Sequence, residues 1–581
     1  MPTRWQSLFF LFKATCFRGR RWLLGILRGN PPTRRPGPVD ARAPVGAESR
    51  SALYPNRLAA EFALQAGKVQ NLRLAARHLH GITIPAGEVF SFWAQVPRPS
   101  TRRGFAAGRE LREGCVIPSV GGGLCQLSNA LYDAALKAGF EIVERHAHSR
   151  RLPGSMAEAG RDATVFWNYV DLRFRPADEV QLEVFLTRDE LVVRTRALAA
   201  RTGPASPAPP DDDAARASEK AAARAASEPP AESCETCGVT SCFRNPGATS
   251  LPQKALTAWL ADAWWPEFGR YLQERRAAQD VLLMPLDSKR WRLGNYRWDA
   301  TGFARCRQHP WPTLRRALAS RRLAAQGAAR QRALLRFDEA MAQSFARHIP
   351  AEATHLVISQ NLLPYLHRGG VLGGRTYDVF MQRLPLRALQ DTLDRAAVRW
   401  PDSPTLADFR ADPALLDLES EALAEARAWI TPHAAIANLA GPRAIKLDWE
   451  LPPQAAVNPD PEGAIFFPAP TLGRKGAWEL REFARQHGVR LRVAGPNLEA
   501  PGFWDGCEVE QGTGFALDGV RAAVLPAWVE NQPRQLLRAA AAGIPVFAAP
   551  ACGLAGVPGV TEIDSLDEVR MADLIGAGRA G

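Results

Sequence analysis

The sequence has no apolar run long enough to cross a bilayer. Near its start, Leu8–Phe12 and Trp22–Leu27 are apolar, but each is far shorter than the ~20 residues that a spanning helix needs. No small-residue cleavage site follows them, so the pattern does not predict a signal peptide. Residues 1–30 contain basic and no acidic side chains, which favours a helix on the inner face of a membrane. The alternative is a basic segment that packs or frays.

Cysteine is scarce, and the nine cysteines are an odd number of mostly isolated residues. This excludes a disulfide framework and predicts a reducing, cytoplasmic location. Three of them are close together, namely Cys234, Cys237 and Cys242, and three thiolates at this spacing could hold a structural zinc ion or an iron–sulfur cluster. A fourth ligand is missing nearby, and Cys306 and His309 are the next candidates. A loop without metal is the alternative.

The charge balance is mildly basic, with 73 Lys and Arg against 60 Asp and Glu and a net charge of +13. This excess suits anionic partners such as nucleotide diphosphates or an acidic membrane surface. A genome that favours Arg codons would produce the same balance. Because no motif of a nucleic-acid-binding fold accompanies the charge, we predict no nucleic-acid partner.

Composition and periodicity divide the 581 residues into several parts. The first globular part mixes helices and strands, so we expect an α+β domain there. From about residue 250 onward apolar strands alternate with helices, which predicts an α/β module with two Rossmann-like halves and parallel sheets. The predicted parts are a basic N-terminal segment and linker (1–50), the α+β domain (51–200), a disordered linker (201–233), the cysteine group with a connecting helix (234–275), and the two halves (276–430 and 431–581).

The stretch from Ala522 to Gly556 predicts a ligand site. A buried strand ends near Pro526, and a loop follows that carries Glu530 and Asn531; the next helix begins near Pro533. In an open parallel sheet, ligands bind beyond the carboxyl ends of the strands. A helix N-terminus there suits a phosphate, and a carboxylate suits sugar hydroxyls.

This stretch resembles the donor half of GT-B glycosyltransferases of the retaining type. The matching residues are Glu530, Asn531, Pro533, Leu536, Leu537, Ala539, Gly543, Pro545 and Val546. Upstream, Phe466–Gly476 resembles the strand and loop that supply a basic pair to the donor diphosphate, here Arg474 and Lys475, and Gly495 fits the next turn.

The resemblance implies a transferase that uses a nucleotide sugar and requires no cofactor. Arg474 and Lys475 would neutralise the leaving diphosphate, and Glu530 would orient the sugar. The family's second glutamate falls on Arg538, which cannot accept hydrogen bonds from a ribose but could meet a phosphate. Because of this departure, the alternative is a module that binds sugar nucleotides without catalysing their transfer.

The half at 276–430 would bind the acceptor. Candidate residues near predicted strand ends are Asp287, Lys289, His367 and Arg368. A histidine such as His367 is equally compatible with a structural role.

A second candidate site lies in the α+β domain. The string Gly121-Gly122-Gly123-Leu124-Cys125 places Cys125 in the first turn of a predicted helix, where the helix dipole lowers the pKa of a thiol. His146 and His148 follow, and Asp162 precedes a later strand. This is the chain order of papain-like and transglutaminase-like thiol sites. The alternative is a small buried cysteine beside a glycine turn.

The same segment strongly resembles VanW-like proteins, which are named for an accessory member of vancomycin resistance clusters. The matching strings are Ile84–Phe92, Gly121–Ser128, Leu131-Tyr132, Glu144–Ser149 and Gly160–Thr164, within about Asn71 to Arg196. The family implies a link to the cell envelope or to antibiotic resistance.

Three functions follow from these patterns. The first is a glycosyltransferase-like protein whose VanW-like domain handles an envelope glycan or lipid acceptor, with peripheral membrane contact. The second is a non-catalytic fusion that binds sugar nucleotide or envelope components. The third is a thiol enzyme that uses Cys125.

Overall fold

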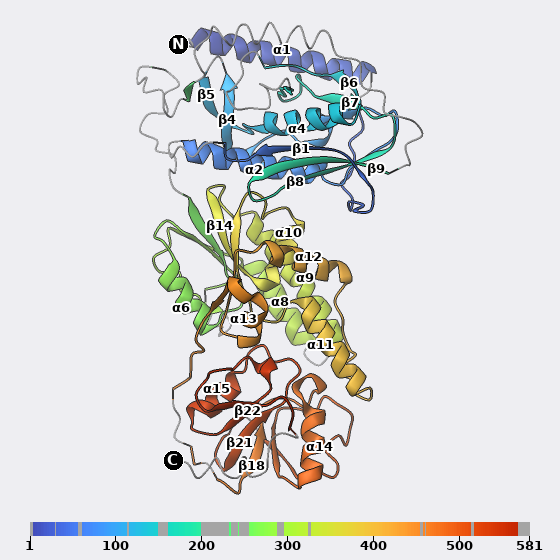
Figure 1. Ribbon diagram of the computed structural model, residues 1–581. Coiled ribbons are helices and arrows are strands. Elements are labelled where there is room, and N and C mark those ends of the chain that lie inside the picture. The colour runs from blue at the N-terminus through green and yellow to red at the C-terminus, as the bar shows by residue number, and fades with distance from the viewer. Residues whose placement is uncertain are drawn as a thin grey trace. The chain divides into compact units, whose positions relative to one another are not determined.

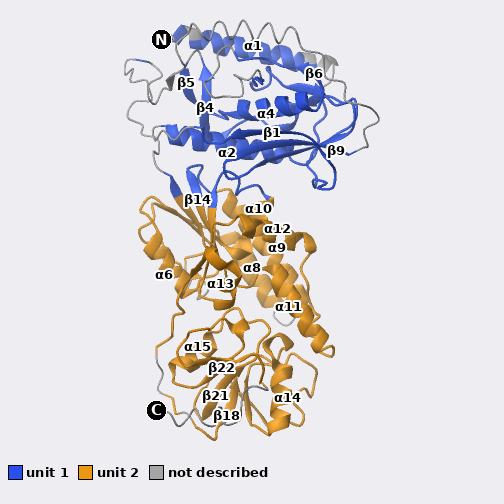
Figure 2. Cartoon of the chain, in the orientation of Figure 1, with its two compact units in different colours: residues 1–256, 349–355, 369–376 blue, residues 257–348, 356–368, 377–581 orange. Residues whose placement is uncertain are grey.

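The computed structural model describes residues 4–28, 31–55, 61–112, 115–148, 161–198, 232–233, 242, 255–287, 296–323, 327–453, 457–458, 460–512 and 516–566. The chain forms two compact units, which Figure 2 shows in different colours. Unit 1 contains residues 1–256, 349–355 and 369–376, and unit 2 contains residues 257–348, 356–368 and 377–581.

Unit 1 is built from small sheets and the helices α1 (Arg4–Arg28), α2 (Phe62–Leu79), α3 (Phe92–Gln95) and α4 (Leu124–Lys137). Its sheets have the orders β1-β9-β8-β2, β10-β5-β4 and β3-β7-β6. The strands are β1 (Val45–Ala52), β2 (Thr83–Ile84), β3 (Phe90–Ser91), β4 (Ala107–Arg112), β5 (Cys115–Val120), β6 (Glu141–Glu144), β7 (Arg173–Arg175), β8 (Val180–Leu186), β9 (Glu190–Ala197) and β10 (Glu232–Ser233).

The core of unit 1 forms where α2 and α4 pack on the larger sheet and on each other (Figure 1). Leu72 of α2 and Leu127 of α4 are fully buried, as is Leu182 of β8. The apolar residues of α4 recur every three to four positions, so one face of the helix enters the core. This confirms the α+β class predicted for the first domain.

The glycine string before α4 is required by close packing. A Cβ atom on Gly122 would lie 2.5 Å from the carbonyl oxygen of Gly108 in β4, which is closer than side chains tolerate. Gly123, the N-cap of α4, has a φ of 92°, a left-handed conformation that glycine adopts without strain. The turn between β5 and α4 therefore lies against β4, and this fixes where α4 and Cys125 begin.

Unit 2 contains two parallel sheets flanked by helices (Figure 1), which confirms the prediction of two Rossmann-like halves. The first has the order β13-β12-β11-β14-β15-β16-β17 and the second β20-β19-β18-β21-β22-β23. The strands are β11 (Leu256–Leu260), β12 (Val281–Met284), β13 (Arg305–Gln308), β14 (Ala353–Ser359), β15 (Thr376–Phe380), β16 (Ala428–Thr431), β17 (Ala444–Lys446), β18 (Ala464–Phe467), β19 (Leu491–Ala494), β20 (Val509–Gly512), β21 (Val520–Leu525), β22 (Val546–Ala548) and β23 (Val560–Glu562).

The helices that accompany these sheets have the following bounds: α6 (Pro266–Arg275), α8 (Pro310–Arg322), α9 (Gly327–Ala346), α10 (Leu363–Arg368), α11 (Leu386–Arg399), α12 (Pro413–Glu425), α13 (Ala434–Ala440), α14 (Ala477–His487) and α15 (Arg534–Ala541).

The first sheet differs from the sequence-based expectation at three strands. β11, an interior strand, lies in the segment 234–275 that we assigned to the cysteine group and a connecting helix. β13 is an edge strand with the polar sequence RCRQ, so it has no apolar run to reveal it. β17 pairs in parallel with β16, and the first sheet therefore extends beyond the border predicted at residue 430.

Each parallel sheet of unit 2 has a point where the strand order reverses. In the first sheet this point lies between β11 and β14, and in the second between β18 and β21. Loops that leave such neighbouring strands in opposite directions open a crevice at the carboxyl edge, which is where ligands bind in doubly wound folds. A ligand site in unit 2 would therefore lie at one of these two edges.

Candidate functional site

The predicted donor residues gather at the carboxyl edge between β18 and β21. Lys475, in the loop after β18, places its Nζ 2.7 Å from Oε2 of Glu530, in the loop after β21. The backbone N–H groups of Trp528 and Val529 each donate to the carbonyl oxygen of Arg474, at 3.1 Å. The two loops are thus bound to each other by backbone and side chains.

Burial and neighbouring charges shift the pKa values of this cluster in opposite directions. Burial lowers the pKa of Arg474 and of Lys475 because it disfavours their charged forms. Burial alone would raise the pKa of Glu530, but the charge and hydrogen bond of Lys475 outweigh it and lower that pKa. Arg474 lies near both Glu530 and Asp408. The arrangement offers two cations to an anion and holds Glu530 ionised.

The remaining predicted donor residues lie at the rim. Gly495 follows β19 and is exposed, with a φ of 97°. Asn531 is half-buried next to Glu530. Arg538 is exposed on α15, where it donates to Gln535 Oε1 at 3.0 Å.

Sequence reasoning missed two contacts that support Glu530 and α15. His433, buried just after β16, places its Nε2 2.9 Å from the carbonyl oxygen of Glu530. Arg534, the first residue of α15, forms two hydrogen bonds of 2.7 and 2.6 Å to the carboxylate of Glu267, which is fully buried. A glycine-rich or acidic motif marks neither residue, so only the fold reveals them.

The residues predicted to bind an acceptor do not form one cluster. The backbone N–H of Asp287 donates to Gln308 Oε1 at 3.3 Å. His367 lies 3.3 Å from Glu421, and Arg368 forms an ion pair of 2.5 Å with Glu339, both near the end of α10. Lys289 lies outside the described residues.

A different charged network occupies the carboxyl edge between β11 and β14. Arg316 of α8 donates to both carboxylate oxygens of Asp262, at 2.5 and 2.7 Å. Arg316 also contacts Asp338 at 3.2 Å, and Asn361 Nδ2 donates to Asp262 at 2.6 Å and to Asp338 at 2.9 Å. Burial raises the pKa of Asp338 to about 7. Asp262 directly after a buried strand was the available sequence signal.

In unit 1, three of the predicted thiol-site residues lie together. His148 Nδ1 donates a short hydrogen bond to Asp162, whose side chain is fully buried. His148 Nε2 lies 2.9 Å from the hydroxyl of Thr164, and that hydroxyl lies 3.6 Å from Cys125 Sγ. Cys125 Sγ and His148 Nε2 thus share the Thr164 hydroxyl as a common neighbour. The order of groups is therefore carboxylate, imidazole, hydroxyl and thiol.

Hydrogen bonds that involve the backbone hold the side chains of the thiol site in place. The backbone N–H of His148 donates to Asp162 at 2.6 Å, and Arg145 Nε donates to the carbonyl oxygen of Asp162 at 2.7 Å. On α4, Ser128 donates to the carbonyl oxygen of Ala163 at 2.5 Å. The segments that carry His148 and Asp162 are thus bound to each other, and the latter is bound to α4, the helix that carries Cys125.

The electrostatics favour an ion pair of thiolate and imidazolium. Burial alone would raise the pKa of Cys125, but the hydrogen bond and charge of His148 outweigh it and lower that pKa. Burial likewise opposes protonation of His148, yet Asp162 and Cys125 together raise its pKa to about 10. Cys125 is half-buried.

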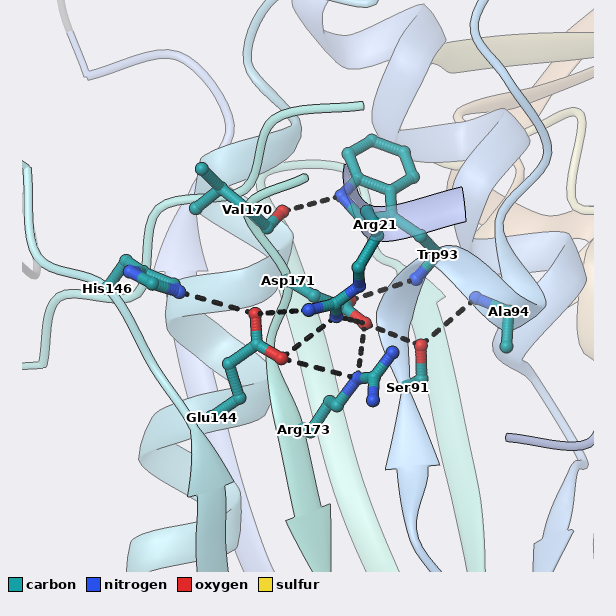
Figure 3. Close-up of polar contacts among 9 residues, drawn as sticks. All are labelled: Arg21, Ser91, Trp93, Ala94, Glu144, His146, Val170, Asp171 and Arg173. Atoms are coloured by element: carbon teal, nitrogen blue, oxygen red, sulfur yellow. Dashed lines mark hydrogen bonds and ion pairs between the residues drawn. The ribbon is translucent and has the colours of Figure 1, made fainter. Parts of the chain in front are cut away.

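His146, the fourth predicted residue, belongs to another cluster, which Figure 3 shows. Its Nε2 lies 3.3 Å from Glu144 Oε1. Glu144 also pairs with Arg21 of α1 at 2.8 Å, and Asp171 accepts from Ser91 Oγ at 2.6 Å. Beside this network lies a cavity of about 210 Å³. Because Arg21 contributes to it, the cluster fastens α1 to the rest of unit 1.

The segment that carries the thiol site has known relatives. Residues 67–196 match the family model described as VanW like protein. The chain is 32% identical over 146 residues to the vancomycin B-type resistance protein VanW of Enterococcus faecalis, and 35% identical over 105 residues to the uncharacterized protein YoaR of Bacillus subtilis. Unit 1 contains a VanW family domain. The chain spans 53% of the length of the first relative and 34% of the second.

Outside the VanW domain, similar solved structures are glycosyltransferases. Sucrose-phosphate synthase of Thermosynechococcus elongatus is 12% identical with a TM-score of 0.33, and the match covers 56% of this chain and 89% of that one. The UDP complex of TcCGT1 is 14% identical with a TM-score of 0.29, covering 56% and 90%. The galactosyltransferase WaaB of the lipopolysaccharide outer core is 14% identical with a TM-score of 0.25, covering 51% and 80%.

Two further predictions concern metal and membrane. Cys234 and Cys237 lie outside the described residues, and Cys242 is half-buried. In the described ranges no group of three or more His, Cys, Asp or Glu side chains is placed to hold a metal ion. The zinc or iron–sulfur site stays a prediction. No helix among the described residues has both the length and the apolar character to span a bilayer.

Proposed function

We propose that unit 2 transfers a sugar, with retention of configuration, from a nucleotide sugar to an acceptor related to the cell envelope. The observation that carries this proposal is the Arg474–Lys475 pair facing Glu530 at the switch point of a parallel sheet. Cations at this edge suit a diphosphate whose charge develops as the sugar leaves, because preorganised charge stabilises the transition state. Glu530, held by Lys475, accepts hydrogen bonds from the hydroxyl groups of the donor sugar.

The donor site is tested by thermal unfolding of the full protein with a panel of nucleotide sugars and free nucleotides. A ligand that binds the native state stabilises it by about 2.7 kcal/mol at a hundredfold excess over Kd, so the Tm should rise with concentration. Glu530→Gln removes an ionised acceptor worth roughly 1.5–3 kcal/mol, so we expect about tenfold or greater loss of affinity for the sugar donor.

Glu508→Gln is the matched control, because Glu508 pairs with Arg490 on the exposed surface of the same half. It should leave the ligand-induced shift unchanged. A panel without any shift would contradict the donor site. A shift without transfer to any acceptor would replace the transferase by the binding-only function.

We propose further that unit 1 places the protein on the cytoplasmic face of a membrane, through α1. One face of α1 packs inward: Phe10 contacts Phe166, Phe17 stacks on Tyr169 and Ala14 is buried. The opposite face exposes large apolar side chains, including Trp5, Leu8, Phe9, Phe12, Trp22 and Leu23. The helix has no acidic residue, and Arg4, Lys13 and Arg20 are exposed along it. An apolar stripe flanked by basic groups fits an anionic lipid surface.

Vesicle co-sedimentation tests this contact. The protein should bind vesicles of phosphatidylcholine with phosphatidylglycerol more tightly than vesicles of phosphatidylcholine alone. Replacing Trp5, Phe9 and Phe12 together by serine should weaken binding by about 100-fold or more, since each side chain loses roughly 1–2 kcal/mol of apolar burial. Trp311→Ser removes a tryptophan that is 74% exposed in unit 2 and should have no effect. Equal binding by the triple variant would refute the α1 contact.

A further inference from the structure

Cys125 differs from the other cysteines whose surroundings the structure describes. Cys306 is also half-buried, but burial and Asp287 raise its pKa to about 11. Cys552 is fully buried and donates to the carbonyl oxygen of Leu525 at 3.6 Å. Cys125 alone among the described cysteines shares a hydroxyl neighbour, Thr164, with an imidazole, and that imidazole is held by a buried carboxylate. A merely structural cysteine needs neither group.

We propose that the VanW domain cleaves an acyl donor, an amide or ester, through a thioester on Cys125. Cys125 is the nucleophile, His148 exchanges the proton and Asp162 orients the imidazole. The geometry supports these roles because Nδ1 of His148 faces Asp162 and Nε2 faces the Thr164 hydroxyl beside Cys125. This activity is separate from sugar transfer, since its residues all lie in unit 1.

The reaction balances without any redox partner. The Cys125 thiolate attacks the carbonyl carbon and forms a C–S bond. The bond from that carbon to the leaving nitrogen or oxygen breaks, and imidazolium Nε2–H of His148 gives its proton to the leaving atom. Neutral His148 then takes a proton from water, whose oxygen attacks the thioester carbon. The C–S bond breaks, the acid leaves, and the thiolate and imidazolium return.

Acyl transfer also requires hydrogen-bond donors for the oxyanion that forms on the carbonyl oxygen. The start of α4 supplies such donors. Cys125 is the second residue of α4, so its backbone N–H belongs to the first turn, ahead of Gln126, whose N–H already donates to the carbonyl oxygen of Gly123 at 3.1 Å. N–H groups of a first turn, together with the positive end of the helix dipole, stabilise a developing negative charge on the carbonyl oxygen. The glycines of the turn at 121–123 lie against Pro99, Gly108 and Lys68, and this packing fixes the position of the helix start.

Thiol reactivity in the unmodified full protein is the first test. At about pH 7, iodoacetamide should alkylate Cys125 about 100-fold or more faster than Cys306, because the pKa of Cys125 is lowered below its ordinary value while burial raises that of Cys306 to about 11. Peptide mapping by mass spectrometry reads both sites in one sample, so Cys306 serves as the internal control. Equal rates at the two cysteines would overturn the proposal. Because no substitution is needed, a folding defect cannot obscure this result.

Acyl transfer is the second test, with p-nitrophenyl acetate as the probe. An acid quench should trap an acetyl group on Cys125 in the wild type. His148→Ala should slow acetylation about 100-fold, the usual contribution of a proton-transfer group. Asp162→Asn should shift the pH profile of the rate toward higher pH, which a purely structural role would not do. Absence of acetylated Cys125 would overturn the acyl chemistry.

The two proposals fail separately. Cys125→Ala should abolish acetylation yet retain the rise in Tm that nucleotide sugar causes in unit 2. Glu530→Gln should weaken that rise in Tm yet retain acetylation of Cys125. Loss of both properties in Cys125→Ala would contradict the independence of the two sites.

Discussion

Arg316→Met is expected to lower the free energy of unfolding by about 3–5 kcal/mol at neutral pH, the usual cost of removing one partner of a buried ion pair. The side chain of Asp262 is 2% exposed and accepts two hydrogen bonds from Arg316. Without the guanidinium, that carboxylate keeps only Asn361 as a side-chain donor among the residues that the structure describes. Urea unfolding followed by tryptophan fluorescence measures the change, since Trp298 Nε1 donates to the carbonyl oxygen of Asp262 at 2.6 Å.

Arg387→Met is the matched control. Arg387 and Asp417 form an ion pair of 2.5 Å, but more than half of each side chain is exposed. Exposed pairs contribute about 0–1 kcal/mol, so this variant should unfold almost as the wild type does. Similar losses in the two variants would mean that Arg316 does not compensate a buried charge.

The pH dependence of this network has a definite sign. The folded-state pKa of Asp338 is raised to about 7 by burial, so the folded protein holds a proton there that the unfolded chain releases near pH 4. Stability from this group therefore falls as pH rises from about 4 to 7 and stays low above that. Asp338→Asn should remove this slope and raise stability at pH 8 by about 2–4 kcal/mol. An unchanged slope would exclude Asp338 as its source.

This network also shows which site residues a sequence conceals. Asp262, Arg316, Asp338 and Asn361 come from four separate elements and share no motif, so only the order of the strands brings them together. Glu530 and the Arg474–Lys475 pair could be predicted because each lies in a recognisable strand–loop–helix pattern. The buried parallel strands could be predicted for a related reason. β18, β19 and β22 are short runs made mostly of apolar residues, the pattern by which buried parallel strands are recognised in a sequence.

The thiol site marks a different limit of sequence reasoning. The order of cysteine, histidine and aspartate suggested the site, but two histidines were available. His146 and His148 are two positions apart in an extended segment, where side chains of i and i+2 share a face, so spacing cannot choose between them. The structure separates them through their partners, because Asp162 contacts His148 and Glu144 contacts His146.

Gly476→Ala is expected to destabilise unit 2 by about 2–5 kcal/mol and to abolish the nucleotide-sugar shift. Gly476 follows Lys475 and forms the N-cap of α14 with a φ of 79°. A Cβ atom there would overlap the carbonyl oxygen of Pro526, just after β21. The side chain would therefore push the Arg474–Lys475 loop away from the loop that carries Glu530. Left-handed strain and overpacking add to the cost.

Gly488→Ala separates these two effects on the same helix. Gly488 is the C-cap of α14 with a φ of 61°, and a Cβ atom there would meet no neighbour within 4 Å. Gly488→Ala therefore adds only the left-handed backbone strain, which costs roughly 1–2 kcal/mol. This variant should retain the rise in Tm with nucleotide sugar. The difference between the two variants measures the close approach of the two loops. If both variants lost the same stability and kept the shift, the contact at Pro526 would not be what holds Lys475 against Glu530.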